Sequence, residues 1–119
     1  FSGGWHPPSL LYTVDIDGGE PVLQELHRGG LPIGALEDVP YGANTVDVPA
    51  DARLLILCDG TYEIELPEGG MLGLDGLTEF IRARVASPTL LTDITEWIRT
   101  FHGDGPLEDD FSLVRVHLC

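Results

Sequence analysis

The chain has 119 residues, of which 43% are apolar, and six basic against twenty acidic side chains give it a net charge of −14. This length supports one domain or part of one, and the apolar fraction is that of a folded protein. The negative charge argues against nucleic acid and anionic membranes as partners, and the longest purely apolar run, Leu54–Cys58, is too short to cross a bilayer.

Strands and turns are expected in the first half of the chain. Ser9–Val14 is rich in aliphatic residues, Asp17-Gly18-Gly19 has turn composition, and Val22–His27 alternates apolar with polar residues. Together these segments predict a β-hairpin, which Gly29-Gly30 ends. The alternation returns over Asn44–Val48 and predicts another short strand.

The second half changes from strand to helix periodicity and back. The continuous apolar run Leu54–Cys58 predicts a central strand buried on both faces. Two helices are expected over about 74–86 and 88–102, the second with Ser87 as its N-cap and Pro88 at its first helical position. Phe111–Leu118 then predicts a closing strand. This order favours an α+β fold in which helices pack on an antiparallel sheet.

Acidic residues lie beside two of the predicted strands. Asp59-Gly60 directly follows Leu54–Cys58, and Asp109-Asp110 directly precedes Phe111–Leu118. If the two strands are antiparallel neighbours, these carboxylates meet at one edge of the sheet, where their repulsion favours a bound cation. Mg²⁺ and Mn²⁺ prefer such oxygen ligands. The alternative is a turn-forming role, because Asp-Gly is a common turn dipeptide.

Several different short motifs follow one another in a characteristic order along the chain. They are Ser2–Pro8, Gly30–Gly34, Leu54–Gly60, Glu63, Gly70–Gly73 and Leu107–Val114. In composition, order and spacing they resemble the landmarks of bacterial PPM phosphatases, in the sporulation-protein-E and RsbU branch of the protein phosphatase 2C superfamily.

This resemblance implies an active site and a fold. Asp59 and Asp109 would be metal ligands, with Gly60 and Asp110 in supporting positions. The family site holds two Mn²⁺ or Mg²⁺ ions that activate water for attack on phosphorus, so no side chain acts as a covalent nucleophile. The family fold is a sandwich of two antiparallel sheets flanked by helices.

The resemblance also implies that residues 1–119 form the C-terminal half of a longer domain. The first half of the family domain carries a Gly-Asp pair whose aspartate bridges both ions, and no segment of this chain matches it. We therefore expect the chain alone to be inactive. The missing half would come from the same longer chain or from a partner copy in a dimer.

Two functional hypotheses follow. In the first, the complete parent domain hydrolyses phosphoserine or phosphothreonine on a small signalling protein of the anti-sigma-factor-antagonist type. In the second, Gly3, Trp5 and Cys58, which replace the Asn, Gly and Thr usual in the family, mark a degenerate phosphatase fold that binds a signalling partner without hydrolysis. A plain acidic α+β domain without a metal is the third alternative.

The two cysteines bear on the compartment. Cys58 lies within an apolar run and Cys119 is the last residue, a pattern unlike a disulfide framework or a zinc ribbon. Buried free thiols are typical of a reducing compartment, and no signal-peptide pattern opens the sequence. We therefore expect a cytoplasmic protein, and the resemblance described above implies a bacterial signalling protein.

Overall fold

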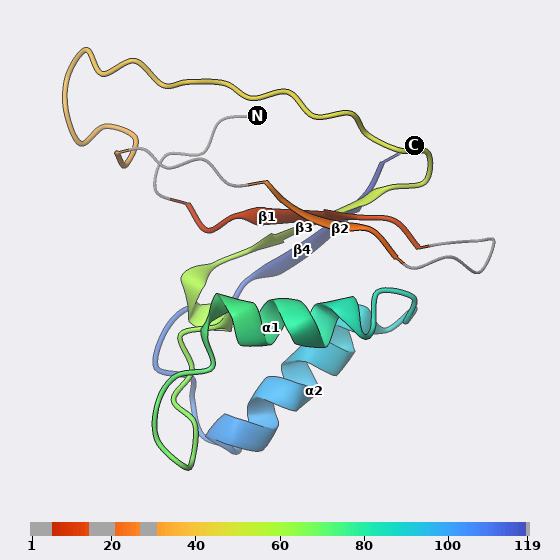
Figure 1. Cartoon of the computed structure of the whole chain (residues 1–119). Coiled ribbons are helices and arrows are strands. Elements are labelled where there is room, and N and C mark those ends of the chain that lie inside the picture. Colours follow the sequence, from red (N-terminus) through yellow and green to blue (C-terminus); the bar gives the residue numbers. More distant parts are fainter. Residues whose placement is uncertain (1–5, 15–20, 27–30, 119) are drawn as a thin grey trace.

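The fold is that of a computed structural model, which describes residues 6–14, 21–26 and 31–118. Figure 1 shows a four-stranded sheet with two helices on one of its faces. The elements are β1 (Ser9–Tyr12), β2 (Leu23–Leu26), β3 (Arg53–Leu57), a 3₁₀ turn η1 (Asp59–Thr61), α1 (Gly73–Arg82), α2 (Leu90–His102) and β4 (Leu113–His117). The predicted α+β class, with two helices before a closing strand, is confirmed.

The sheet has the order β2-β1-β3-β4, and each neighbouring pair is antiparallel. β1 and β2 form the predicted hairpin, with Ser9 opposite Leu26. β3 and β4 pair directly although both helices separate them in the sequence, and Leu57 lies opposite Leu113. The end of β3 therefore lies beside the start of β4, which is the arrangement needed to bring the acidic residues of the two segments together.

One face of the sheet carries the hydrophobic core. Because side chains alternate along a strand, Leu10 and Tyr12 of β1 and Leu55 and Leu57 of β3 share this face. They pack against buried residues of the two helices, which are Leu77, Ile81, Leu90, Ile94 and Ile98. Burial of one such side chain contributes about 1.5–3 kcal/mol before conformational entropy is counted. The helices are therefore fixed on the sheet by their apolar stripes.

The helices differ slightly from the predicted bounds. α1 ends at Arg82, because the Arg84 amide donates to Ile81 at 2.9 Å and the Ser87 amide donates to Arg84 at 2.9 Å, which tightens the connection into turns. α2 begins at Leu90. The Ser87 hydroxyl, expected as its N-cap, donates instead to the Asp93 carboxylate at 2.6 Å.

The opposite side of the sheet also carries apolar residues. Alternation along the strands places six of them on this surface, which we call the far face (Leu11, Leu26, Leu54, Ile56, Val114 and Val116). Val114 is 52% exposed and Val116 is 37% exposed. The far face is therefore only partly covered within this chain.

The long connection between β2 and β3 crosses this side of the sheet (Figure 1). Residues 44–48 of the connection and apolar side chains of the sheet side line a cavity of about 290 Å³. Asn44–Val48, predicted as a short strand, is not one in the structure. Its alternating residues lie against the sheet without joining it.

Some predictions fall outside the described residues. These concern the turn at Asp17-Gly18-Gly19, the break at Gly29-Gly30, the segment Ser2–Trp5 and Cys119. Among the helices that the structure describes, none has the length and hydropathy needed to cross a membrane.

Candidate metal centre

Asp59 stands where β3 gives way to the tight turn η1. The buried Thr61 fixes this turn, because its hydroxyl donates to the Cys58 carbonyl at 2.6 Å and its amide donates to the same oxygen at 3.1 Å. The Asp59 Oδ1 accepts the Gly60 amide at 3.0 Å, which orients the carboxylate. The turn role considered for Asp-Gly is thus real, and it places a carboxylate at the strand end.

Gly60 has a packing role in addition to its place in the turn. A Cβ atom at this position would overlap the carbonyl oxygen of Asp110 and lie 3.1 Å from its carbonyl carbon. Only glycine lets the segment before β4 approach η1 this closely. Gly60 therefore has a steric role between η1 and the segment before β4, while its predicted supporting role at a metal site stays a prediction.

Glu63 lies one helical turn beyond Asp59. Its amide donates to the Asp59 carbonyl at 2.9 Å, an i to i+4 bond that brings both side chains to the same side of the turn. The chain then doubles back, and the Leu72 amide donates to the Ile64 carbonyl at 2.8 Å. From the sequence, Glu63 is recognisable only as one of the motifs that resemble the family. Its spacing of four residues from Asp59 was the signal that could have identified it as a third acid of the site.

Asp109 comes from the segment that leads into β4. Its Oδ1 accepts the Asp110 amide at 2.7 Å, so it is oriented by the following amide in the same way as Asp59. Cys58 fastens this segment to the end of β3. Its thiol donates to the Asp110 carbonyl at 3.2 Å, its sulfur accepts the Ser112 amide at 3.2 Å, and its own amide donates to the Ser112 carbonyl at 3.3 Å.

The end of α2 holds the same segment from the other direction. Arg99 donates to the Gly105 carbonyl at 2.6 Å. The His102 Nε2 lies 2.6 Å from the Pro106 carbonyl, and because a carbonyl only accepts, the ring donates. Gly103, with a φ of +82°, ends the helix. The turn between α2 and Asp109 is thus tied to the helix at two points.

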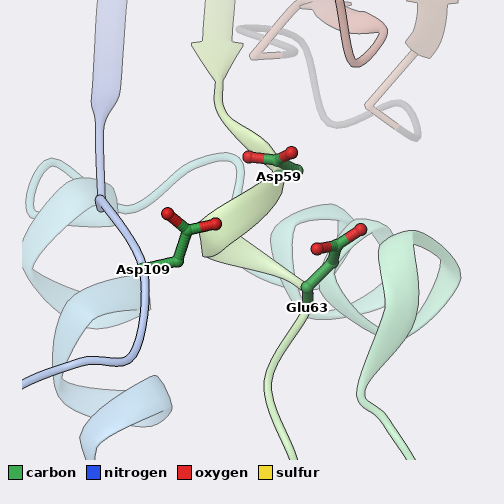
Figure 2. A group of neighbouring side chains, drawn as sticks. All are labelled: Asp59, Glu63 and Asp109. Atoms are coloured by element: carbon green, nitrogen blue, oxygen red, sulfur yellow. The ribbon is translucent and has the colours of Figure 1, made fainter.

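These contacts bring three carboxylates together, as Figure 2 shows. One oxygen from each of Asp59, Glu63 and Asp109 lies within 4.8 Å of the other two. We call these three side chains the acidic cluster. The Asp110 carboxylate is not among them, and Asp110 contributes its carbonyl to the packing instead. Asp59 and Asp109, predicted from separate parts of the chain, therefore do meet.

Two carboxylates of the cluster, Asp59 and Glu63, affect the pKa of the neighbouring Tyr62. Burial raises the pKa of Tyr62 above its usual range, and the charges of Asp59, Glu63 and Cys58 raise it further. Within the described ranges, no ion pair engages any carboxylate of the cluster. Three mutually repelling carboxylates with no basic partner form a hard-oxygen donor set, and this set fits a divalent cation such as Mn²⁺ or Mg²⁺.

The sequence of the chain also matches a known protein family. Residues 1–118 match the family of stage II sporulation protein E (SpoIIE). No curated protein and no solved structure matches the chain. The family match spans both strands of the β3–β4 pair and all three acids of the cluster.

Proposed function

The chain belongs to the stage II sporulation protein E family of PPM-type phosphatases, and from this premise we propose that it supplies part of the metal site for hydrolysis of phosphoserine or phosphothreonine on a protein. The observation that carries the proposal is the acidic cluster at the shared edge of β3 and β4. The family uses divalent metal chemistry, and these carboxylates are the donors such chemistry requires.

Each residue of the site has a distinct part in this proposal. Asp59, Glu63 and Asp109 would hold the cation, Mn²⁺ or Mg²⁺, through carboxylate oxygens. When bound, such a cation lowers the pKa of a water molecule and offsets negative charge on the phosphate. Gly60 and Cys58 keep the two acidic segments at a fixed separation.

We further propose that residues 1–119 are the C-terminal half of the phosphatase domain. The exposed valines of the far face, Val114 and Val116, support this, because a sheet face of this kind is stabilised when another layer covers it. The other half, from the same longer chain or a partner copy, would cover the far face and supply the ligands of the second ion. On this basis the chain alone is inactive.

The substrate class rests on the family and on composition. We propose a small phosphorylated signalling protein of the anti-sigma-factor-antagonist type, in a bacterial cytoplasm. The net charge of −14 favours a protein partner over nucleic acid or an anionic membrane. The free thiol of Cys58 is in keeping with a reducing compartment.

Calorimetric titration with Mn²⁺ tests the metal site. The wild-type chain should show a binding step, and Asp59→Asn, Glu63→Gln and Asp109→Asn should each weaken it by more than about tenfold. Asp104→Asn is the matched control, because it removes an exposed acid that lies outside the cluster. Unchanged binding in all three cluster variants would leave the aspartates as turn residues.

Hydrolysis is tested separately, with a phosphoserine peptide and the full-length protein in Mn²⁺. Phosphate release that falls with each cluster variant supports catalysis. Metal binding without any phosphate release would instead favour the degenerate, partner-binding alternative.

A further inference from the structure

A cavity of about 240 Å³ opens directly beside the acidic cluster. It shares Gly60, Glu63 and Asp109 with the candidate metal centre. Small-molecule sites usually have volumes of roughly 300–1,000 Å³, so this cavity has the size for one side chain rather than for a cofactor. Its position makes it adjacent to any group that is held at the cluster.

One part of the cavity wall is apolar. It is formed by side chains from the segment after η1, from the end of α2 and from the loop before Asp109, which are Ile64, Leu66, Phe101 and Leu107. Ile64 is buried and the other three are half-buried. Such a wall offers contact to the methylene stem of a long side chain.

Most polar side chains in the rest of the lining are acidic; the exception is His102, whose ring donates to the Pro106 carbonyl. Glu65 and Glu108 line the cavity in addition to the two cluster residues, and both are exposed. In the portion of the chain that the structure describes, no ion pair engages either of them. Among the described residues that line the cavity there is no lysine or arginine, so Glu65 and Glu108 form an acidic rim without a lysine or arginine partner in the lining.

We propose that this cavity is a substrate subsite for an arginine or lysine side chain that flanks the phosphorylated residue. Both side chains combine an apolar stem with a cationic head, which matches the apolar wall and the acidic rim. The proposal rests on the proposed function, because it takes the substrate phosphate to lie at the cluster. Successive residues of an extended peptide are about 3.3 Å apart, so a neighbour of the phosphoserine reaches a cavity that shares three residues with the metal site.

The test uses the full-length protein with Mn²⁺ and labelled peptides that carry a non-hydrolysable phosphonate analogue of phosphoserine. Peptide pairs differ only by arginine or glutamine, one or two residues to either side of the analogue, and fluorescence anisotropy gives each dissociation constant. At one of these positions the arginine peptide should bind more tightly. Glu65→Gln and Glu108→Gln should each reduce this preference by up to about fivefold.

Glu68→Gln is the matched control. Glu68 is exposed in the neighbouring turn but does not line the cavity, so its substitution removes the same charge without touching the subsite. A preference for arginine that falls equally in Glu68→Gln would be general attraction by an acidic protein, and it would overturn the subsite. Equal binding of the arginine and glutamine peptides at every position would overturn it as well.

Phosphate release from the corresponding phosphoserine peptides separates this proposal from the proposed function. An arginine preference that depends on Glu65 and Glu108 supports the subsite even if no phosphate is released, in which case only the catalytic proposal fails. Phosphate release without such a preference leaves the phosphatase standing and removes the subsite.

Discussion

At the scale of single residues, Gly60 and Cys58 set the distance between the two acidic segments. Gly60 lets the Asp110 carbonyl approach η1, and Cys58 bonds to both Asp110 and Ser112. Neither side chain is a metal ligand in our proposal. Both act on the site through the spacing of Asp59 and Asp109.

Gly60→Ala should therefore destabilise the fold and weaken the site together. The added methyl group overlaps the Asp110 carbonyl, and overpacking of this kind typically costs about 1–3 kcal/mol. Denaturant unfolding measures the stability and Mn²⁺ calorimetry the affinity. Gly105→Ala is the control, since a Cβ there meets nothing within 4 Å. Equal stability of the two variants would contradict the close approach.

Cys58→Ala should weaken Mn²⁺ binding by about tenfold, a size typical for groups that orient metal ligands. The substitution removes the thiol contacts to Asp110 and Ser112 but leaves the backbone bond to Ser112. Cys58→Ser retains a donor and an acceptor and should recover most of the affinity. If the alanine variant binds Mn²⁺ like the wild type, the backbone pairing alone positions Asp109.

At the scale of elements, the start of α2 is organised around one carboxylate. Asp93 accepts hydrogen bonds from the Ser87 hydroxyl at 2.6 Å and the Thr89 hydroxyl at 2.9 Å. These two bonds hold the pKa of Asp93 below its ordinary value near 3.8, and the bond from Ser87 has the larger effect. A carboxyl group whose pKa is lower in the folded chain than in the unfolded chain stabilises the fold at pH values above its ordinary pKa. This contribution is lost as the pH falls through the lowered pKa.

Asp93→Asn should accordingly lower the melting temperature at pH 7. The difference from the wild type should shrink as the pH falls below about 3.8, because the unfolded wild-type chain takes up a proton at Asp93 more readily than the folded chain does. Thermal unfolding followed by circular dichroism at several pH values gives both quantities. Glu96→Gln, an exposed position on the same helix, is the control. A difference that stays constant down to pH 2 would show that the charge of Asp93 is unimportant.

The elements also show which features of this fold are readable from the sequence. Helical spacing of apolar residues and the continuous run Leu54–Cys58 predict α1, α2 and β3, because such patterns follow from burial on one or both faces. The order of the elements allows the antiparallel β3–β4 pair, on which the meeting of Asp59 and Asp109 depends, but does not require it; the structure establishes this pair.

Other features depend on contacts that no local pattern encodes. The alternation over Asn44–Val48 is that of a strand, yet the segment lies against the sheet within the β2–β3 connection. Glu63 joins the cluster because η1 turns the chain by one helical turn after Asp59. Asp110 has its role through its carbonyl oxygen, and the sequence reveals nothing about which main-chain atoms meet.

At the scale of the whole molecule, the sheet has one covered face and one partly covered face. The core binds both helices to one side, whereas the far face leaves Val114 and Val116 accessible on the edge strand β4. An apolar edge strand is a common route to association between copies. We therefore expect the isolated chain to self-associate through the far face.

The double variant Val114→Thr, Val116→Thr should therefore reduce self-association of the isolated chain. Threonine keeps the β-branched shape that suits a strand while it adds a hydroxyl to each exposed position. Sedimentation velocity over a range of concentrations measures the effect. Met71→Gln, at an exposed apolar position beside α1, is the control and should leave association unchanged. Equal association of both variants would mean that the far face is not the contact.

The pairing of β3 with β4 has a consequence for how the protein is made. The two strands enclose both helices in one long loop of the chain, and such distant pairings form slowly because the loop must close first. During translation, Asp59 and Glu63 leave the ribosome well before Asp109, so the nascent chain has two acids of the cluster but not the third. The acidic cluster is thus brought together only after β4 has been synthesised and has paired with β3, and a chain truncated before Asp109 lacks its third acid.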